Sequence, residues 1–274
     1  MAENTEIQWC DSTSNLAMGC RGCELWNPSR GVRHCYAGVM TEKYAGGKGW
    51  SIAFDKPILF PERMEQAEKW RDLTGADRSR KPWLNGYPRL VFLNDMSDTF
   101  TRGLPRDWLA DYLPRIAASP HIYMSLTKRA RQQRDFSWHY NWPDNLWAMT
   151  TITTQASLGR GVHLGLSRAK IKILSVEPML ERITLGDIIR GIDGVIVGFE
   201  SGEGCRPGES DWMRYLRDEC QAAGVKFFCK QMGGIRNHHG ELSDIPEDLR
   251  IRELPVWTVA PKAAEPKIMQ AELW

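Results

Sequence analysis

The 274-residue chain contains no uninterrupted apolar run of membrane-spanning length, and its start, Met-Ala-Glu-Asn-Thr-Glu, lacks the basic and apolar regions of a signal peptide. No internal repeat is visible. An excess of one charge is also missing: 36 Lys and Arg stand against 34 Asp and Glu, and the net charge of +2 is far from a strongly basic nucleic-acid-binding footprint. These absences predict a cytoplasmic protein without a membrane partner, and they leave a nucleic-acid partner open.

The cysteines lack the pattern of a secreted disulfide framework, since there are seven in a chain of this size and three of them lie close together. These three are Cys20, Cys23 and Cys35, in a stretch that also contains several glycines. Thiolates are soft ligands that select iron–sulfur clusters, zinc or copper(I), and a two-residue gap lets two sulfurs face one metal centre. Glycine permits the φ > 0 turns that wrapping a metal requires. The stretch therefore predicts a metal-binding loop in reducing surroundings.

Three interpretations of this loop compete. A four-iron cluster held by protein alone normally uses four cysteines, so three cysteines indicate a cluster with one iron open to a substrate or cofactor. A structural zinc site needs a fourth ligand, for which His34 or Cys10 are the candidates. A redox Cys-x-x-Cys pair would use the first two cysteines and make the third incidental. We favour the cluster, place zinc second and place the dithiol third.

Basic side chains accompany the thiols in this loop. Arg21, Arg33 and His34 lie next to the cysteines in the sequence. Because nearby positive charge favours the thiolate, we expect these residues to lower the thiol pKa values.

Along the chain, short apolar runs alternate with amphipathic segments, as in proteins that have a parallel sheet with helices outside it. The most economical arrangement for about eight such units is a (β/α) barrel, complete or partial, with the cysteine loop after the first strand. An open doubly wound sheet is the alternative. We expect one domain over 1–254 and an extended tail over 255–274. The expected strands are 13–18, 52–60, 89–93, 121–126, 146–151, 171–176, 194–198 and 225–229.

Polar or ionisable residues follow most of the expected strands. In a barrel all of these strand ends converge on the face that carries active sites, together with the cysteine loop. Glu177 and Glu200 are the most informative, because each directly follows an apolar strand, where a buried carboxylate is costly unless it is paired or used. The candidate site residues outside the loop are Asn94, Asp95, Ser97, Asp98, Lys128, Glu177, Glu200 and Lys230.

The sequence resembles a phage-associated, radical-S-adenosylmethionine-like family that has a three-cysteine motif. The resemblance covers about residues 6–234 and rests on a dispersed series of matches. The matching segments are Ile7-Gln8-Trp9-Cys10-Asp11, the loop ending Cys35-Tyr36-Ala37, Asn94-Asp95-Met96-Ser97-Asp98, Leu126-Thr127-Lys128-Arg129, Ser175-Val176-Glu177-Pro178, Gly198-Phe199-Glu200-Ser201-Gly202 and Lys230-Gln231-Met232-Gly233-Gly234.

This resemblance implies a radical-S-adenosylmethionine-like, TIM-barrel-like fold in which Cys20, Cys23 and Cys35 hold a [4Fe-4S] cluster. The open iron would take S-adenosylmethionine, and its reductive cleavage would give a 5′-deoxyadenosyl radical, with electrons from a reductant protein. The cofactor-binding residues would be Asn94, Asp95, Ser97 and Asp98. The catalytic residues facing cofactor or substrate would be Lys128, Glu177, Glu200 and Lys230.

Two features bear on what the family resemblance implies. A phage association suggests a nucleic acid or nucleotide as substrate, as in base modification. The cysteine spacing here, Cys-x2-Cys-x11-Cys, departs from the usual radical-enzyme spacing of Cys-x3-Cys-x2-Cys. Cluster ligation is therefore an inference from the loop and the family together.

Two other classes of protein are alternatives. The first is a non-enzymatic nucleic-acid-binding protein stabilised by zinc or an iron–sulfur cluster, which would bind in a salt-sensitive way. The second is a barrel hydrolase or transferase that uses Asp95, Asp98, Glu177 and Glu200 with a hard divalent metal while the cysteines are structural. Loss of activity in a carboxylate variant but only loss of stability in a cysteine variant would identify the second class.

Overall fold

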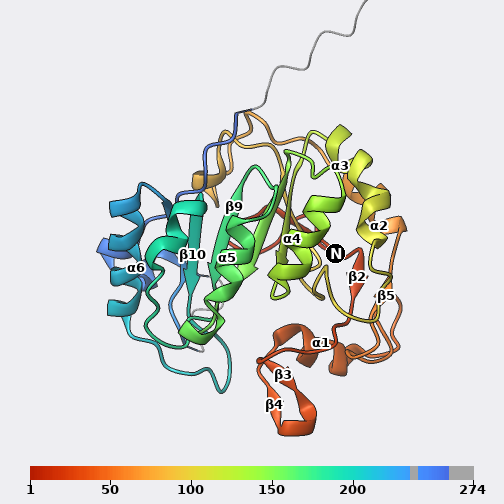
Figure 1. The fold of residues 1–274 in the computed structure, drawn as a ribbon, viewed down its shortest axis with the longest axis horizontal. Helices are drawn as coiled ribbons and strands as arrows, with labels where there is room; N and C mark the ends of the chain where they lie inside the picture. Colours follow the sequence, from red (N-terminus) through yellow and green to blue (C-terminus); the bar gives the residue numbers. More distant parts are fainter. Residues whose placement is uncertain (235–239, 259–274) are drawn as a thin grey trace, which may run out of the picture.

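The computed structural model describes residues 1–234 and 240–258 and centres on a seven-stranded sheet (Figure 1). Every neighbouring pair in this sheet is parallel, and the strands follow one another in chain order, β1-β6-β7-β8-β9-β10-β11. The strands are β1 (Ser12–Ser14), β6 (Leu90–Leu93), β7 (Ile122–Thr127), β8 (Leu146–Thr151), β9 (Lys172–Val176), β10 (Gly194–Gly198) and β11 (Lys226–Gln231).

The order of the strands determines the class of the fold. A doubly wound sheet reverses direction at a switch point, whereas this order runs one way from end to end, as in a barrel. Among the described residues β1 and β11 do not pair with each other, so the sheet is a half-barrel rather than a closed one. The expected partial (β/α) barrel is thus confirmed, and the doubly wound alternative and the complete barrel are wrong.

The helices that follow the strands cover the outer face of the sheet (Figure 1). They are α2 (Glu62–Glu68), α3 (Leu113–Ala118), α4 (Ala130–His139), α5 (Gly159–Gly165) and α6 (Ser210–Ala223). Single 3-10 turns supplement them at Pro28–Arg30, Pro82–Leu84, Trp108–Tyr112, Gln155–Ser157, Gly186–Gly191, Leu242–Asp244 and Glu247–Leu249.

Alternate residues of each strand face opposite sides of the sheet, and both sides are buried. On β6, Val91 and Leu93 join the core under the helices, while Leu90 and Phe92 join a second core inside the half-barrel. A parallel sheet with two covered faces needs continuous apolar runs, which is what the sequence supplies in these strands. Each such side chain contributes about 1.5–3 kcal/mol through its removal from water.

The inner core is closed by segments from both ends of the chain. Trp9 and Leu254 belong to it, and Trp83 packs against it. The Arg252 guanidinium lies over the Trp83 ring and donates a hydrogen bond to Gln8 Oε1 at 3.0 Å. These contacts bridge the opening between β1 and β11 with side chains.

The cysteine segment, which we define as residues 19–58, stands apart from the large sheet (Figure 1). It contains the hairpin of β3 (Trp26–Asn27) and β4 (Val32–Arg33), then α1 (Tyr36–Tyr44). It joins the body of the molecule where β5 (Ile58–Leu59) pairs antiparallel with β2 (Ala17–Met18). The expected strand over 52–60 is therefore wrong, because only its last residues are extended and they pair outside the parallel sheet.

Several other expectations can be compared with the described residues. All seven cysteines lie within them, and each is a free cysteine there. None of the helices in residues 1–234 and 240–258 has the length and apolar character that crossing a bilayer requires. Most of the expected tail, residues 259–274, lies outside the described residues.

Candidate functional site

A cavity of about 490 Å³ opens at the carboxyl ends of the parallel strands, under the cysteine segment. It continues the inner face of the half-barrel, where the apolar side chains of β8 and β9 give way to Thr151 and Ser175. All but one of the predicted site residues line this cavity. They are Cys20, Cys23, Cys35, Asp95, Ser97, Asp98, Lys128, Glu177, Glu200 and Lys230.

Glycine shapes the cysteine loop, as its sequence indicates. Gly19 and Gly22 have φ values of +88° and +79°, in the left-handed region. A Cβ on Gly22 would lie 2.5 Å from the Trp26 carbonyl oxygen, so the chain turns back on itself more tightly than any other residue allows. The Cys23 and Trp26 backbones hydrogen-bond to each other across this turn.

Cys20 is held by polar side chains from the sheet. Both terminal nitrogens of Arg129 lie 3.7 Å from Cys20 Sγ, and Thr101 Oγ1 donates to the same sulfur at 3.5 Å. Arg129 also donates to the Gly22 carbonyl at 3.0 Å and forms an ion pair with Asp98 at 2.9 Å. Since a guanidinium cannot lose its charge at ordinary pH, this arrangement places a permanent positive charge beside the sulfur.

The thiols of Cys23 and Cys35 have raised pKa values, which contradicts the expectation that nearby arginines lower them. Burial is the largest cause for both, and Lys128 acts against it. Arg33 forms an ion pair with Glu42 on the exposed side of the segment. Without a metal these two groups are therefore protonated at neutral pH, and metal binding would displace their protons.

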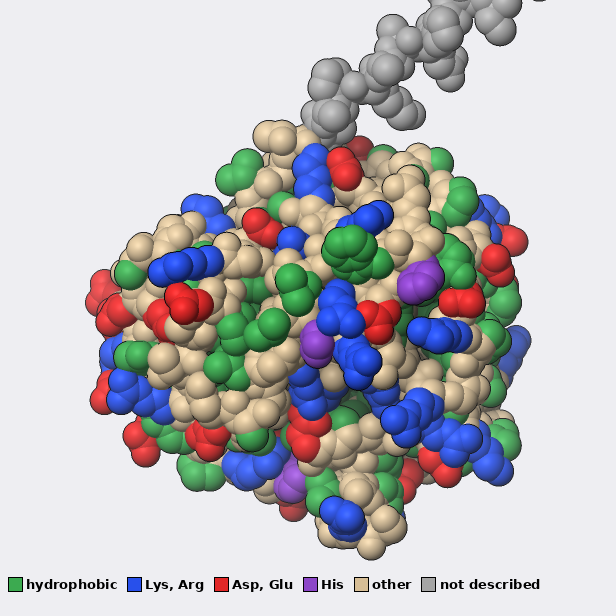
Figure 2. Space-filling view, viewed as in Figure 1, with side chains coloured by type: hydrophobic (Ala, Val, Ile, Leu, Met, Phe, Trp, Pro, Cys, Tyr) green, Lys and Arg blue, Asp and Glu red, His purple; other side chains and the backbone are tan. Residues whose placement is uncertain are grey.

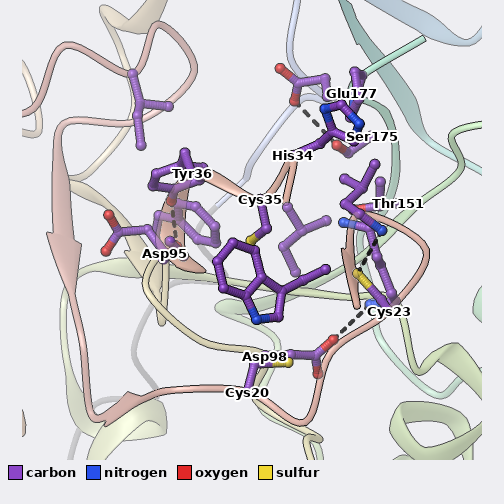
Figure 3. Close-up of a pocket in the computed structure, with 18 of the residues that line it drawn as sticks. Cys20, Cys23, His34, Cys35, Tyr36, Asp95, Asp98, Thr151, Ser175 and Glu177 are labelled. Carbon is purple, nitrogen blue, oxygen red and sulfur yellow. Dashed lines mark hydrogen bonds between the residues drawn. The ribbon is translucent and has the colours of Figure 1, made fainter. Parts of the chain in front are cut away.

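Backbone N–H groups lie near two of the three sulfurs of this loop. The Leu25 N–H donates to Cys23 Sγ at 3.4 Å, and Cys35 occupies the N-cap position of α1, beside the first turn of the helix. Figure 3 shows the three cysteines bordering the same hollow. In residues 1–234 and 240–258 no three His, Cys, Asp or Glu side chains already form a metal site. The thiols would therefore have to converge when a metal binds.

The two proposed fourth ligands for zinc are in different positions. Cys10 is fully buried in the inner core and does not line the cavity. His34 lines the cavity beside Cys35. Of the two candidate fourth zinc ligands, only His34 lines the same cavity as the three thiols.

The segment after β6 lies under the cysteine loop and supports it. Asp95 accepts a hydrogen bond from Asn15 at 2.6 Å, and burial raises the Asp95 pKa. Its backbone carbonyl accepts a hydrogen bond from the Tyr36 hydroxyl (Figure 3). Ser97 donates to the Gly19 carbonyl.

Asn94 is the one predicted site residue that does not line the cavity. It is buried with a left-handed φ of +64°, accepts from the Ala17 N–H at 2.8 Å and donates to Thr99 at 2.9 Å. Its side chain therefore fixes the turn after β6 and is not directed at a ligand.

Two carboxylates at the strand ends are paired with cations, as their burial requires. Glu177 forms an ion pair with Lys230 at 2.8 Å across β10, and it accepts a hydrogen bond from Ser175 (Figure 3). Gly198 lies between them, where a Cβ would come within 3.2 Å of Glu177 Oε1. The cavity therefore has one charge-balanced wall built from β9, β10 and β11.

Glu200 lines the cavity from the end of β10. Burial alone would raise its pKa, but hydrogen bonds from the Arg206 side chain and backbone outweigh burial and lower it. Glu200 is therefore ionised and neutralised by a partner six residues along the chain.

Some site residues had no signal in the sequence. Glu24 sits between Cys23 and the hairpin and forms two hydrogen bonds with Arg160 of α5, at 2.8 and 2.9 Å. Burial acts against this pair, but Arg160 lowers the Glu24 pKa to about 2. Arg129 ends the matching segment Leu126-Thr127-Lys128-Arg129, but nothing in the sequence indicated its contact with Cys20. The Arg129–Cys20 and Arg160–Glu24 contacts each join residues more than 100 positions apart, so local sequence patterns could not reveal them.

The model of the family described as "Protein of unknown function (DUF5131)" matches residues 4–272, so the chain belongs to that family. No curated protein and no solved structure matches the chain.

Proposed function

We propose that this member of the DUF5131 family is a radical-S-adenosylmethionine-type iron–sulfur enzyme built on a partial, TIM-barrel-like fold. The observation that supports this most is the meeting of three cysteines from one loop with charged strand-end residues around a single cavity. The volume of about 490 Å³ lies in the range of cofactor-sized sites. A nucleic acid or nucleotide remains our proposed substrate, because the aromatic residues Trp26, Tyr36 and Phe199 line the same cavity.

Cys20, Cys23 and Cys35 would hold a [4Fe-4S] cluster with one iron free of protein ligands. When bound, the cluster would supply the electron that cleaves S-adenosylmethionine. Arg129 and Thr101 would donate to the Cys20 sulfur, and the Leu25 N–H to that of Cys23. Hydrogen bonds to the sulfurs are among the features that set the potential of such clusters.

The other lining residues would bind and orient the organic ligands. Asp95 and Asp98 offer carboxylates near the loop, while Lys128 offers an ammonium on the same side of the cavity. The Glu177–Lys230 pair presents one acidic and one basic group, which suits a zwitterionic amino-acid moiety. The apolar floor of Phe92 and Leu126 would exclude water below them.

The charge pairing makes the hydrolase alternative less favourable. A hard divalent metal requires several carboxylate oxygens converging on one point. Here Asp98, Glu177 and Glu200 each have their own Arg or Lys partner, so their carboxylate oxygens are already engaged. A cysteine-held metal is the better interpretation of this site.

Anaerobic purification and reconstitution would test the proposal. Iron, sulfide and zinc would be quantified beside visible and electron paramagnetic resonance spectra, with and without S-adenosylmethionine. We expect about four irons per chain in the wild type, a spectrum altered by S-adenosylmethionine, and loss of the cluster in Cys35→Ala. Cys205→Ala is the matched control, because Cys205 does not line the cavity.

Stoichiometric zinc that survives oxygen, with no iron after reconstitution, would contradict the proposal. That result would leave a structural metal and would favour the nucleic-acid-binding alternative.

A further inference from the structure

The outer side of α4 and α5 exposes large apolar side chains. Trp138 on α4 is 55% exposed, while Val162 on α5 and Leu166 one helical turn later are 46% and 55% exposed. The Trp138 indole N–H donates to the Leu166 carbonyl at 3.0 Å, so Trp138 reaches across to the end of α5. The other side of each helix is already packed in the core, through Phe136 and Leu164. The outward side therefore keeps an apolar patch open to solvent.

Arginines surround this patch. Arg131 and Arg134 precede Trp138 by seven and four residues, which places all three on one side of α4. The Arg168 guanidinium lies over the Trp138 ring, with its central carbon 4.2 Å from the ring centroid. We call this surface the α4–α5 face, and it consists of Arg131, Arg134, Trp138, Val162, Leu166 and Arg168.

The charge of the α4–α5 face is positive. Arg131 and Arg134 both pair with Asp135, at 3.9 Å for Arg131, and Arg168 forms no ion pair with any residue that the structure describes. Three arginines therefore stand against one carboxylate. Acids on the adjoining segments are already paired, Asp144 with Lys170 and Asp187 with Arg190.

The residues next to the face leave this excess of positive charge unchanged. His163 of α5 accepts a hydrogen bond from Arg134 at 3.0 Å, and burial together with the charge of Arg134 lowers the His163 pKa, so the ring is neutral near pH 7. Arg106 also acts on the Asp135 carboxylate, and its sequence neighbour Asp107 has the opposite charge. Figure 2 shows Lys and Arg side chains next to hydrophobic and His side chains in the middle of the visible face, where Figure 1 shows α4 and α5.

The combination of side chains indicates the kind of partner. Tryptophan and arginine are enriched in protein–protein interfaces and contribute much of their binding energy, whereas lysine is depleted there. A phosphate backbone would engage the arginines but would leave Val162 and Leu166 uncovered. A partner that covers the whole face has to present apolar and acidic side chains on one surface. Two helices that pack side by side leave a seam between them, and an amphipathic helix is the element that lies in such a seam.

We propose that the α4–α5 face is the docking site for an acidic amphipathic helix of a partner protein. The apolar side of that helix would cover Trp138, Val162 and Leu166, and its carboxylates would pair with the three arginines of the face. The cation–π contact between Arg168 and Trp138 is already formed, so it would hold the indole in place before the partner binds. None of the residues of the face lines the cavity. The inference therefore stands independently of the proposed function.

A labelled model peptide tests this docking site. The probe is a fluorescein-labelled peptide of about 18 residues, or about five helical turns, with leucine on one side of the helix and glutamate on the others. Fluorescence anisotropy at low ionic strength should show saturable binding to the wild type. In Arg131→Glu/Arg168→Glu we expect the affinity to fall at least about tenfold, because charge complementarity is reversed. Trp138→Ala should weaken binding at high salt as well, where screening removes the contribution of the arginines.

Arg30→Glu/Lys48→Glu is the matched control. Both side chains are exposed in the cysteine segment, away from α4 and α5 (Figure 1), and neither pairs with an acid in the part of the chain that the structure describes. This variant changes the net charge equally and should bind the peptide as the wild type does. A second peptide of the same composition, with its leucines spread around the helix, should bind at least about tenfold more weakly. Circular dichroism of each variant would establish that the fold is retained.

Three results would overturn the inference. The first is the absence of saturable peptide binding to the wild type, or equal affinity for the wild type and Arg131→Glu/Arg168→Glu. The second is a single-stranded DNA oligonucleotide that binds the wild type more tightly than the peptide does and loses affinity in the same variant, which would assign the face to a nucleic acid. The third is a wild-type dimer in size-exclusion chromatography that Trp138→Ala converts to a monomer, which would assign the face to a second copy of the chain.

Discussion

The parallel sheet and the cysteine segment are stabilised in different ways. Every residue of β6 and β8 is buried, and the two cores that they separate contain most of the large apolar side chains. The cysteine segment has a small core of its own around Trp26 and Phe54, and its position is fixed by a few polar anchors such as Arg129 and the Glu24–Arg160 pair. The scaffold is therefore rigid without a ligand, whereas the segment would gain order from a metal bound to its thiols.

The sheet should show the largest losses on mutation. Trp147 is fully buried in the inner core, and Trp147→Ala should lower the free energy of unfolding by about 3–5 kcal/mol. Trp138→Ala is the matched control, because Trp138 is 55% exposed on α4, and it should cost less than about 1 kcal/mol. Urea denaturation followed by circular dichroism measures both values, and equal losses would show that burial in the sheet is not the dominant stabilising term.

A substitution inside the segment tests how tightly its small core is packed. A Cβ on Gly38 would lie 2.4 Å from Cε3 of Trp26, so Gly38→Ala must displace α1 or the ring. We expect a loss of about 1–3 kcal/mol, with faster amide exchange over Tyr36–Tyr44 and less iron bound, because α1 carries Cys35 at its start.

Gly159→Ala in α5 is the control for that substitution. Nothing lies within 4 Å of its added Cβ, and helix propensity should stabilise the protein by about 0.5–1 kcal/mol. Unchanged exchange over α1 in Gly38→Ala would mean that the helix is not held by its contact with Trp26.

The Glu24–Arg160 anchor should have the smallest effect, and one that depends on pH. The pKa of Glu24 is lowered to about 2 in the fold, so its contribution is complete above the ordinary glutamate range and is lost as the pH falls toward 2. Glu24→Gln should therefore destabilise by less than about 1 kcal/mol at pH 6, with a smaller difference from wild type at pH 3.

Amide hydrogen exchange over residues 20–35 would show whether Glu24→Gln destabilises the cysteine loop itself. Glu42→Gln is the control, because it removes the more exposed Arg33–Glu42 ion pair. A difference from wild type that grows on acidification would contradict the proposed anchor.

The sequence predicted the sheet well where its strands are apolar on both faces. The strand expected over 13–18 was wrong in its bounds, because β1 is the polar Ser12–Ser14 and Ala17–Met18 pairs outside the sheet as β2. Runs such as Leu90–Leu93 and Gly194–Gly198 are buried on both sides of the sheet. Such strands are continuous apolar runs, so local composition is enough to locate them in the sequence. The strand expected over 52–60 failed for the same reason: these residues are apolar because Phe54 packs on Trp26, not because they join the sheet.

The candidate site was predictable where it follows the strand ends and unpredictable where it depends on long-range pairing. Glu177 and Lys230 were recognisable because each follows an expected apolar strand, and they pair across β10 in one wall of the cavity. The effect of Arg33 was misjudged, because adjacency in sequence says nothing about burial or about a competing partner such as Glu42. Arg129 became visible only when β7 placed it next to Cys20.

The side-chain bridge between Gln8 and Arg252 has a consequence for how the protein is made. These residues are 244 positions apart, and they join segments that close the same inner core. A chain growing from the ribosome can form its helices and neighbouring strands in order, but the floor of the half-barrel stays open until residues near 254 emerge. Residues near Arg252 therefore complete a surface that residues near Gln8 began, and removing them would expose Trp83 to water.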